Sequence, residues 1–260
     1  MTALSINLNK VSLLRNSREG NYPNVVSHAE LCLDHGADGI TVHPRPDQRH
    51  IRPQDVRDLA RLTQTLSTIE FNVEGNPLAP AVGDYPGFLS LVEETQPDQC
   101  TLVPDTDDQL TSDHGFDLHI AAETLEPIIR RLKNQGMRVS LFMDPVPEQI
   151  SLAADIGADR IELYTGPYAA AWGTAELEGI FLQHQLAAEH ANAIGLGVNA
   201  GHDLNLHNLS KFATIDNLLE VSIGHAFIVD SLTMGMGSAV KAYKAQLRST
   251  TGNDNASVSG

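Results

Sequence analysis

The stretch Gly36-Ala-Asp-Gly-Ile-Thr-Val-His-Pro-Arg-Pro-Asp-Gln-Arg-His50 carries the most informative pattern of this chain. Its first glycine is suited to end a helix, and the apolar Ile40 and Val42 then alternate with polar residues as in a short β-strand. Two prolines stop that strand. The loop that follows collects His43, Arg45, Arg49 and His50. Arg can bind phosphate through two parallel hydrogen bonds and His can transfer a proton, so the loop is a candidate anion site; the alternative is a solvated turn.

Short strand-like segments recur along the chain with helical segments between them. We predict strands at Leu4–Asn9, Gly39–Arg45, Thr68–Glu74, Gln99–Pro104, Arg138–Asp144, Arg160–Thr165, Gly195–Asn199 and Glu220–Gly224. We predict helices near residues 24–35, 53–65, 86–95, 119–135, 147–156, 174–193, 205–213 and 230–248. Eight alternating units favour a single closed (β/α)8 barrel with additional helical and loop insertions over a doubly wound open sheet. The barrel should span residues 1–248, and the small, polar residues 249–260 should form a disordered C-terminal tail.

The composition bears on the class of protein. The chain has 260 residues, 42% of them hydrophobic, which is enough for the full core of one barrel domain. Its net charge of −16 argues against nucleic-acid or anionic-membrane partners, because both require a basic surface. The sequence contains neither an apolar run long enough to cross a bilayer nor the charged and apolar regions of a signal peptide. With Cys32 and Cys100 expected as reduced core thiols, we expect a cytoplasmic protein.

The alternation within the strands assigns their polar residues to the interior of the barrel. On the third strand, for example, Glu70, Asn72 and Glu74 alternate with apolar residues. The apolar set must pack on the ring of helices, so the polar set points inward. Buried polar side chains destabilise a fold unless they bond to one another or to a ligand. This interior favours a catalytic barrel over a hydrogen-bonded polar plug without chemistry.

Glu70 and Glu74 point the same way but should lie at opposite ends of the barrel. At about 3.3 Å per residue they are roughly 13 Å apart along the strand. Glu74 directly precedes Gly75-Asn-Pro77, where the strand stops, so it should lie at the C-terminal end, where barrels place their active sites. Glu70 should need a structural partner such as Arg or Lys.

Residues that could take part in chemistry gather on the predicted strands and at their ends, and His43, Glu74 and His202 among them could act as acid or base. The whole set is His43 and Arg45 on strand two, Glu74 on strand three, Glu162 on strand six, and His202 and His225 after strands seven and eight. A glycine precedes each of the last two histidines, which would let a backbone amide approach a ligand closely. The loops after strands seven and eight usually form the phosphate site of a barrel. A lone histidine is more often structural, but histidines at the ends of three strands favour an active site.

Patterns for other activities are missing or weak. Asn7-Leu-Asn9 stands where a barrel metallohydrolase usually places an H-x-H pair. Asp105-Thr-Asp-Asp108 could hold a divalent ion, although such polar loops are usually only solvated. The sequence has no Walker loop, no G-x-G-x-x-G and no G-x-S-x-G, and Lys10, just beyond strand one, is the nearest to a strand-borne lysine. We therefore expect no metal in the site.

At these residues the sequence resembles the pyridoxine 5′-phosphate synthase family of vitamin B6 biosynthesis. The matching segments are Asn7-x-Asn-Lys-x-x-x-Leu-Arg-Asn-Ser-Arg18, Gly36-Ala-Asp-Gly-Ile-Thr-Val-His-x-Arg45 with Arg49-His-Ile51, Asn72-Val-Glu74, Leu102-Val-Pro104, Val139-Ser-Leu-Phe142, Ile161-Glu162 with Thr165-Gly166, Val198-Asn-Ala-Gly-His202 and Ile223-Gly-His225. They occur in order over nearly the whole chain, so the resemblance is highly specific.

The resemblance implies a (β/α)8 barrel, typically octameric, that joins 1-deoxy-D-xylulose 5-phosphate to 3-amino-2-oxopropyl phosphate. The family closes a pyridine ring and releases phosphate and water without a metal or organic cofactor. It implies that His43 and Glu74 are general bases, that His202 is a general acid and that Glu162 stabilises the transition state. It also implies sugar-phosphate contacts from Arg45, His50 and Thr111, and amino-ketone phosphate contacts from Asn7, Arg18, Gly224 and His225.

The chain departs from the family pattern at two places. Many members have Asp-His where this chain has Asn9-Lys10, at a site that contacts the sugar phosphate. Asp203 follows His202 where some members have Gly. We expect Asn9, Lys10 and Asp203 to bind substrate, with the reaction unchanged. The alternatives are another phosphosugar lyase or isomerase and a non-catalytic barrel that senses a phosphorylated metabolite. Residues 10–23 and 105–118 are candidates for a lid.

Overall fold

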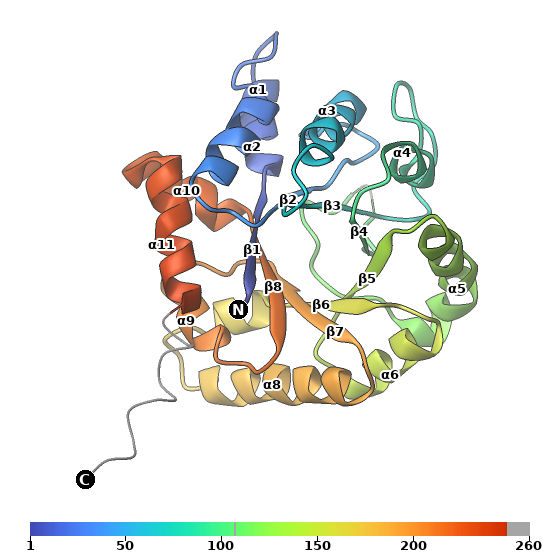
Figure 1. Ribbon diagram of the computed structural model, residues 1–260. Coiled ribbons are helices and arrows are strands. Elements are labelled where there is room, and N and C mark those ends of the chain that lie inside the picture. The colour runs from blue at the N-terminus through green and yellow to red at the C-terminus, as the bar shows by residue number, and fades with distance from the viewer. Residues whose placement is uncertain (107, 249–260) are drawn as a thin grey trace.

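The computed structural model describes residues 1–106 and 108–248, so the tail predicted at 249–260 lies outside the described residues. Its strands form a closed parallel barrel in sequence order, surrounded by helices (Figure 1). The strands are β1 (Ala3–Asn7), β2 (Gly39–Val42), β3 (Glu70–Gly75), β4 (Gln99–Leu102), β5 (Arg138–Met143), β6 (Arg160–Tyr164), β7 (Gly197–Gly201) and β8 (Leu218–Ile223). The prediction of a single (β/α)8 barrel is confirmed, and the open-sheet alternative is wrong.

The helices differ from the predicted set in three ways. In the described part of the chain they are α1 (Asn9–Asn16), α2 (Val25–Asp34), α3 (Pro53–Thr63), α4 (Phe88–Thr95), α5 (Leu118–Asn134), α6 (Pro147–Asp155), α7 (Gly166–Ala170), α8 (Leu177–Ala193), α9 (Leu209–Phe212), α10 (His225–Met234) and α11 (Met236–Arg248). The segment 10–23, predicted as a loop, begins inside α1, and α7 was also not predicted. The segment predicted as one helix at 230–248 belongs to two helices, because Gly235 separates them in a left-handed conformation with φ 81°.

Helix α1 ties the first strand to the loop after β2. Its Arg15 is buried and forms a bidentate ion pair with Asp55 of α3, with Nη1–Oδ1 and Nη2–Oδ2 distances of 2.5 and 2.8 Å. Asp55 also accepts a hydrogen bond from the backbone N of Arg52, which caps the start of α3. From α1, Asn16 Nδ2 donates to the carbonyl oxygen of His50 at 2.8 Å. The loop that carries His50 is therefore held from two sides.

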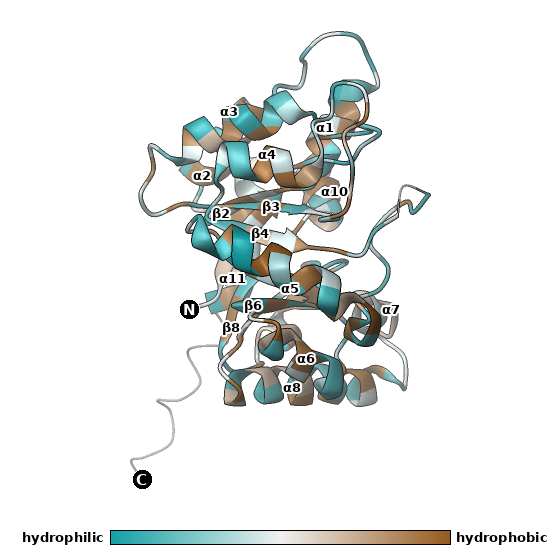
Figure 2. Ribbon diagram, turned by 90° about the vertical axis from the view of Figure 1, so that its right-hand side faces the viewer, coloured by the Kyte–Doolittle hydropathy of each residue, from teal (hydrophilic) through white to brown (hydrophobic). Residues whose placement is uncertain are grey.

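The outward faces of the strands pack on the helices. Ile6, Ile40, Phe71 and Val139 are each at most 1% exposed and belong to the main apolar core. The surrounding helices mix hydrophobic and hydrophilic residues, as amphipathic helices do (Figure 2). Cys32 and Cys100 are free and buried in this layer, as predicted. Among the described helices, none is long and apolar enough to cross a membrane.

The inward faces are polar, as the alternation predicted. In the middle of the barrel, the hydroxyl oxygens of Ser5 and Thr41 are 2.7 Å apart. Thr101 Oγ1 donates to Asn72 Oδ1 at 3.1 Å. Each of these side chains is at most 3% exposed, so the hydrogen bonds offset the loss of hydration.

The N-terminal end of the barrel holds a network of charged residues. Arg138 forms an ion pair with Glu70, which confirms that Glu70 needs a basic partner, and its Nε donates to Gln99 at 2.9 Å. Burial and the charge of Glu70 raise the pKa of Glu220 well above its usual value. Burial opposes ionisation of Glu70 too, but the hydrogen bond from Glu220 and the charge of Arg138 hold its pKa below the usual value. The two carboxyl groups thus share one proton, carried by Glu220.

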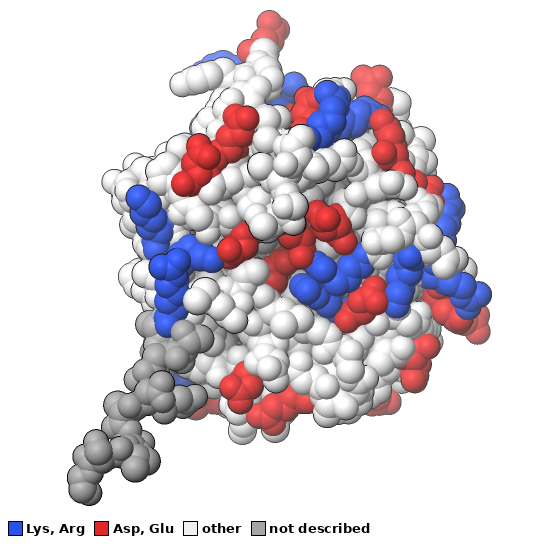
Figure 3. All heavy atoms as spheres, in the orientation of Figure 1, with Lys and Arg blue, Asp and Glu red and all other residues white. Residues whose placement is uncertain are grey.

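The molecular surface carries charges of both signs. In the view of Figure 3, Lys and Arg side chains lie beside Asp and Glu side chains in the middle of the face. Pairing of this kind is seen on the outer helices, where Arg57 of α3 contacts Glu94 of α4 through Nε–Oε1 at 2.6 Å. Such exposed pairs contribute little to stability, at most about 1 kcal/mol each.

Candidate active site

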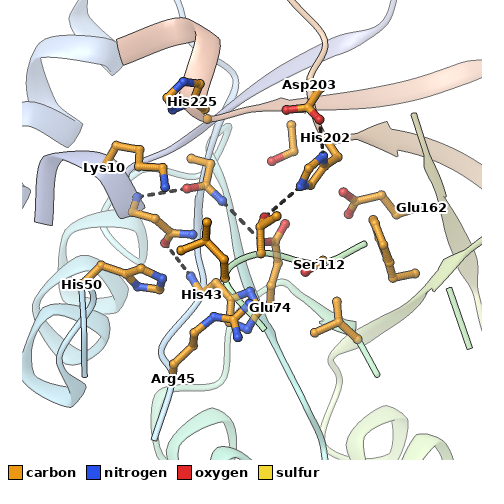
Figure 4. A pocket seen from close by; sticks show the side chains of 18 residues that line it. Lys10, His43, Arg45, His50, Glu74, Ser112, Glu162, His202, Asp203 and His225 are labelled. Carbon is orange, nitrogen blue, oxygen red and sulfur yellow. Dashed lines mark hydrogen bonds and ion pairs between the residues drawn. The ribbon is translucent and has the colours of Figure 1, made fainter. Parts of the chain in front are cut away.

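A cavity of about 350 Å³ lies at the C-terminal ends of the strands. Its lining consists of Asn7, Asn9, Lys10, His43, Arg45, His50, Glu74, Val103, Leu110, Thr111, Ser112, Phe142, Glu162, His202, Asp203, Ser222, Gly224 and His225. In Figure 4, Lys10, His50 and Arg45 lie on one side of the cavity, and Glu162, His202 and Asp203 lie on the other. Every residue predicted for the site lines this cavity except Arg18 and Arg49, and the latter pairs with Asp47 at 2.6 Å.

Arg18 lies away from this cavity. It follows α1 on an exposed segment, and its Nη1 donates to the carbonyl oxygen of Ser17 at 2.8 Å. The Arg18 side chain forms no hydrogen bond or ion pair with any of the described residues that line the cavity. Its expected contact with a substrate phosphate remains a prediction.

Two asparagines organise the first wall of the cavity. Asn7 Oδ1 accepts from the backbone N of Asn9 at 2.9 Å, and Asn7 Nδ2 donates to Glu74 Oε2 at 3.3 Å. Asn9 Oδ1 accepts from the backbone N of His43 at 2.9 Å. Asn9 therefore fixes the point where the chain leaves β2, in addition to lining the cavity.

Arg45 is held by an acidic partner. Its Nη2 forms a buried ion pair with Asp105 Oδ2, which also accepts from Ser112 Oγ at 2.8 Å. Asp105 thus belongs to the Arg45 side of the cavity, and its suggested part in a cation-binding loop is not supported. Within residues 1–106 and 108–248, no cluster of three or more His, Cys, Asp or Glu is arranged to hold a metal ion.

Both histidines of this wall are neutral at pH 7. Burial lowers the pKa of His43 well below its usual value, and the positive charge of Arg45 lowers it further. Burial, followed by the charges of Arg45 and Lys10, lowers the pKa of His50 to about 3. The Nδ1 atom of His50 accepts a hydrogen bond from the backbone N of Ile51 at 2.9 Å. A neutral ring at His43 is able to accept a proton.

The two glutamates of the cavity are harder to ionise than ordinary carboxyl groups. Burial raises the pKa of Glu74 well above its usual value, and the nearby charges of Glu162 and Glu220 raise it further. Burial also raises the pKa of Glu162 to about 7, although the electrostatic interaction with His202 acts to lower it. The Oε2 atom of Glu162 is buried and has no hydrogen-bond partner among the described residues. Such groups are able to exchange protons near neutral pH.

Glu162→Gln should stabilise the protein relative to the wild type, and this gain should grow as the pH rises. The pKa of Glu162 is about 7 in the fold and 4.5 for an ordinary glutamate, so its stabilising contribution is complete below pH 4.5 and is lost as the pH approaches 7. Gln has the shape of the protonated acid and never ionises. The Tm of the variant relative to wild type should therefore rise by several degrees between pH 5 and pH 8, at about 2–4 °C per kcal/mol. Thermal unfolding at both pH values measures this difference, with the exposed Glu123→Gln as control. A Tm difference between variant and wild type that does not change with pH would contradict the raised pKa of Glu162.

His202 lies on the opposite wall, between two side-chain partners. Its Nδ1 is 2.9 Å from Asp203 Oδ2, and its Nε2 is 2.8 Å from Thr111 Oγ1. The ring of Tyr164 packs edge-on against it, with the ring centroids 5.2 Å apart. The loop after β4 therefore reaches across the cavity through Thr111 and meets the loop after β7.

The glycines before His202 and His225 make room for side chains of the site. A Cβ on Gly201 would lie 2.1 Å from Glu162 Oε1, so any larger residue would displace that carboxyl group. A Cβ on Gly224 would lie 3.2 Å from Asn7 Cβ. Gly224 also precedes the first residue of α10, so the start of this helix lines the cavity. Packing in the site is thus a second reason for glycine at these positions, besides the close approach of a ligand that the sequence suggested.

Five lining residues were missed in the sequence: Val103, Leu110, Ser112, Phe142 and Ser222. The alternation of the eighth strand points Ser222 inward, so that pattern could have identified it. Ser112 and Leu110 lie in an irregular loop, and no local pattern shows that this loop folds over the cavity.

Comparison with known proteins gives one family. Residues 4–249 match the family model described as pyridoxal phosphate biosynthesis protein PdxJ. The chain is 53% identical over 249 residues to the pyridoxine 5′-phosphate synthase of Xanthomonas axonopodis pv. citri, covering 95% of this chain and 97% of that protein. It is 52% identical over 244 residues to the enzyme of the same name from Albidiferax ferrireducens, covering 93% and 96%.

Similar solved structures support the fold alone. One is the tryptophan synthase alpha chain of Legionella pneumophila, with a TM-score of 0.64 and 14% identity, covering 95% of this chain and 92% of that one. Another is the 3-hexulose-6-phosphate synthase of Salmonella typhimurium, with a TM-score of 0.62 and 16% identity, covering 96% and 100%. At these identities the likeness concerns the barrel and not its chemistry.

Proposed function

Because this chain belongs to the PdxJ family of pyridoxal phosphate biosynthesis proteins, we propose that it is a pyridoxine 5′-phosphate synthase. The reaction joins 1-deoxy-D-xylulose 5-phosphate to 3-amino-2-oxopropyl phosphate, closes the pyridine ring and releases phosphate and water. The observation that carries the proposal is the grouping of His43, Glu74, Glu162 and His202 around one cavity with basic side chains near its rim.

The reaction needs this kind of cavity. Condensing an amine with a ketone, eliminating water and phosphate and closing a ring are successive proton transfers. They require several acids and bases within reach of one bound intermediate. The buried walls also keep bulk water from the condensation, which itself expels water.

We assign the proton transfers from position and charge. His43 is neutral and faces the interior beside Arg45, so it serves as a base on the sugar-phosphate side. Glu74 is a second base, and its raised pKa makes its ionised form a stronger proton acceptor. Glu162 faces the middle of the cavity and stabilises positive charge that develops there. His202, on the opposite wall, acts late as the proton donor.

Two ends of the cavity suit the two phosphate groups. Arg45, His50 and Thr111, with Asn9 and Lys10, form the end proposed for the sugar phosphate. Gly224 and His225 at the start of α10, with Asn7, form the end proposed for the amino-ketone phosphate. An Arg side chain and a helix N-terminus are both favourable partners for phosphate.

Arg45→Ala should raise the KM for the sugar phosphate by at least tenfold, a loss of about 1.4 kcal/mol of binding, with a smaller change in kcat. Arg remains protonated and is a poor acid or base, so its role is to bind. The substitution also leaves Asp105 buried without its cation, so rates must be referred to folded protein. Arg57→Ala, which removes a surface arginine paired with Glu94, is the matched control. An unchanged KM with only kcat lost would contradict a binding role.

Omission of each substrate tests the proposed function. Protein incubated with both phosphates should form a product with the absorbance of pyridoxine 5′-phosphate, and neither substrate alone should give it. Conversion of the sugar phosphate alone would indicate another lyase or isomerase. Binding of either phosphate in calorimetry without turnover would indicate a metabolite sensor. Either result would overturn the proposal.

We propose further that the chain forms a homo-octamer in the cytoplasm, as the family resemblance implies. Large apolar side chains are exposed on its surface, among them Tyr22 and Leu232, at 88% and 79% exposure. Burial of such side chains between subunits would stabilise an assembly. Sedimentation should then give a mass eight times that of the 28.1 kDa chain, and a monomer would contradict the octamer.

A further inference from the structure

His202 and Asp203 have backbone conformations that their side chains rarely adopt. Their φ angles are 84° and 58°, both in the left-handed region. Such strain persists where the surroundings hold it in place, most often at functional sites. Here Thr165 Oγ1 donates to the carbonyl oxygen of Gly201 at 2.7 Å, and Asn208 Nδ2 donates to that of Asp203 at 3.3 Å. These hydrogen bonds therefore hold the loop after β7 in the left-handed conformation.

This conformation turns two consecutive side chains towards each other. Asp203 Oδ2 lies 2.9 Å from His202 Nδ1, and both are labelled in Figure 4 on the same wall of the cavity. A carboxylate can only accept a hydrogen bond, so Nδ1 carries the hydrogen. In the neutral ring Nε2 is then the acceptor, and Thr111 Oγ1 at 2.8 Å is its donor. The pair of contacts thus selects one tautomer of His202.

We propose that Asp203 is a positioning residue that fixes the ring and the tautomer of His202, so that Nε2 is the atom that exchanges the proton in the cavity. The proposal rests on the proposed function only for the role of His202. It replaces the expectation from the sequence that Asp203 binds substrate. Asp203 acts through His202 and does not need to touch the reacting atoms.

The charge and exposure of Asp203 fit this role. The hydrogen bond from His202 is the main reason that the pKa of Asp203 lies below its usual value, against the opposing effect of burial, so the group is a carboxylate at neutral pH. Its side chain is 49% exposed, whereas that of His202 is only 19% exposed. The carboxylate therefore lies on the more exposed side of the pair. The edge of Tyr164 further limits rotation of the ring.

The arrangement explains how the ring can give up a proton without turning. When His202 carries two ring protons, Nδ1 donates to Asp203 and Nε2 donates towards Thr111 or a substrate oxygen. After the Nε2 proton is transferred to that oxygen, the ring is already in the Nδ1–H tautomer. Without the carboxylate, the neutral ring is free to carry its proton on Nε2 instead, which removes the acceptor from the cavity side.

Steady-state kinetics of two variants separate positioning from binding. Asp203→Gly should lower kcat at least about tenfold, as expected when a histidine loses its orienting carboxylate, and leave the KM of each phosphate within about twofold. Asp203→Asn keeps the shape of the side chain but can donate its amide hydrogen to Nδ1, which selects the Nε2–H tautomer, so its kcat should stay as low as that of Asp203→Gly. Asp216→Asn, an exposed aspartate before β8, is the matched control and should behave as wild type. Raised KM values with kcat unchanged would show a substrate contact and overturn the proposal.

Nitrogen NMR of the substrate-free protein gives an answer that does not depend on the reaction. In histidine-labelled protein, the ring signals of His202, identified by their loss in His202→Asn, should show the Nδ1–H tautomer in the neutral state. Asp203→Gly should show a mixture or the opposite tautomer, and Asp203→Asn should favour the Nε2–H tautomer because its amide can donate to Nδ1. Identical His202 signals in wild type and Asp203→Gly would overturn the proposal. Wild-type protein that makes no product would instead count against the proposed function, and the NMR comparison would still decide on Asp203.

Discussion

Glu74→Gln should lower turnover by about 10²- to 10⁴-fold, the range that a positioned general base contributes. Gln keeps the shape of the side chain and the hydrogen bond from Asn7 Nδ2 but cannot accept a proton. It also removes a buried carboxyl group whose pKa is raised by burial and by Glu162, so the fold should be at least as stable as before. Steady-state rates and thermal unfolding of the same preparation test both expectations.

Glu70→Gln is the matched control because it makes the same change on the same strand at the other end of the barrel. Glu70 pairs with Arg138 and shares a proton with Glu220, so its loss should lower the Tm by several degrees, at about 2–4 °C per kcal/mol. The rate per folded molecule should stay near that of wild type. Exchanged phenotypes, with Glu70→Gln inactive and Glu74→Gln unstable, would mean that the proposed roles of the two ends are wrong.

His202→Asn should lower kcat by at least about a hundredfold and stall the reaction after the first condensation. Asn can still form a hydrogen bond near Thr111 but cannot deliver a proton. Both substrates should therefore bind and condense, because His43 and Glu74 are intact. Reduction with borohydride followed by mass spectrometry should detect an adduct that contains both substrates.

His207→Asn is the control for this variant, since His207 lies on the same loop with an exposed side chain. It should turn over like the wild type and leave no adduct. Recovery of only free substrates from His202→Asn would show that His202 acts before the condensation, contrary to the late role.

The fold was predictable where one strand pattern repeats. Residues such as Asn72 and Glu74 were assigned to the interior because every second position points the same way, and the barrel register preserves that alternation. Helix α1 was missed for a physical reason. It is only eight residues long and polar on average, and it is stabilised by the buried pair between Arg15 and Asp55, which are 40 residues apart.

The site was predictable as a set of residues but not as a set of contacts. Family segments at strand ends identify residues such as His43 and His202, because barrel strands deliver their C-terminal ends to one cavity. No local sequence pattern shows that Asp105 forms an ion pair with Arg45, since the two lie 60 residues apart on different loops. The pairing of Asp203 with His202 depends on two left-handed backbone angles that no residue pattern in the sequence reveals.

A double-label experiment tests the central claim most directly. Wild-type protein receives 1-deoxy-D-xylulose 5-phosphate labelled with ¹³C and 3-amino-2-oxopropyl phosphate labelled with ¹⁵N, and mass spectrometry follows the product. The account predicts one product that carries both labels and a single phosphate group, with one inorganic phosphate released for each molecule formed. A product that carries only one of the labels, or recovery of both substrates unchanged, would contradict the account.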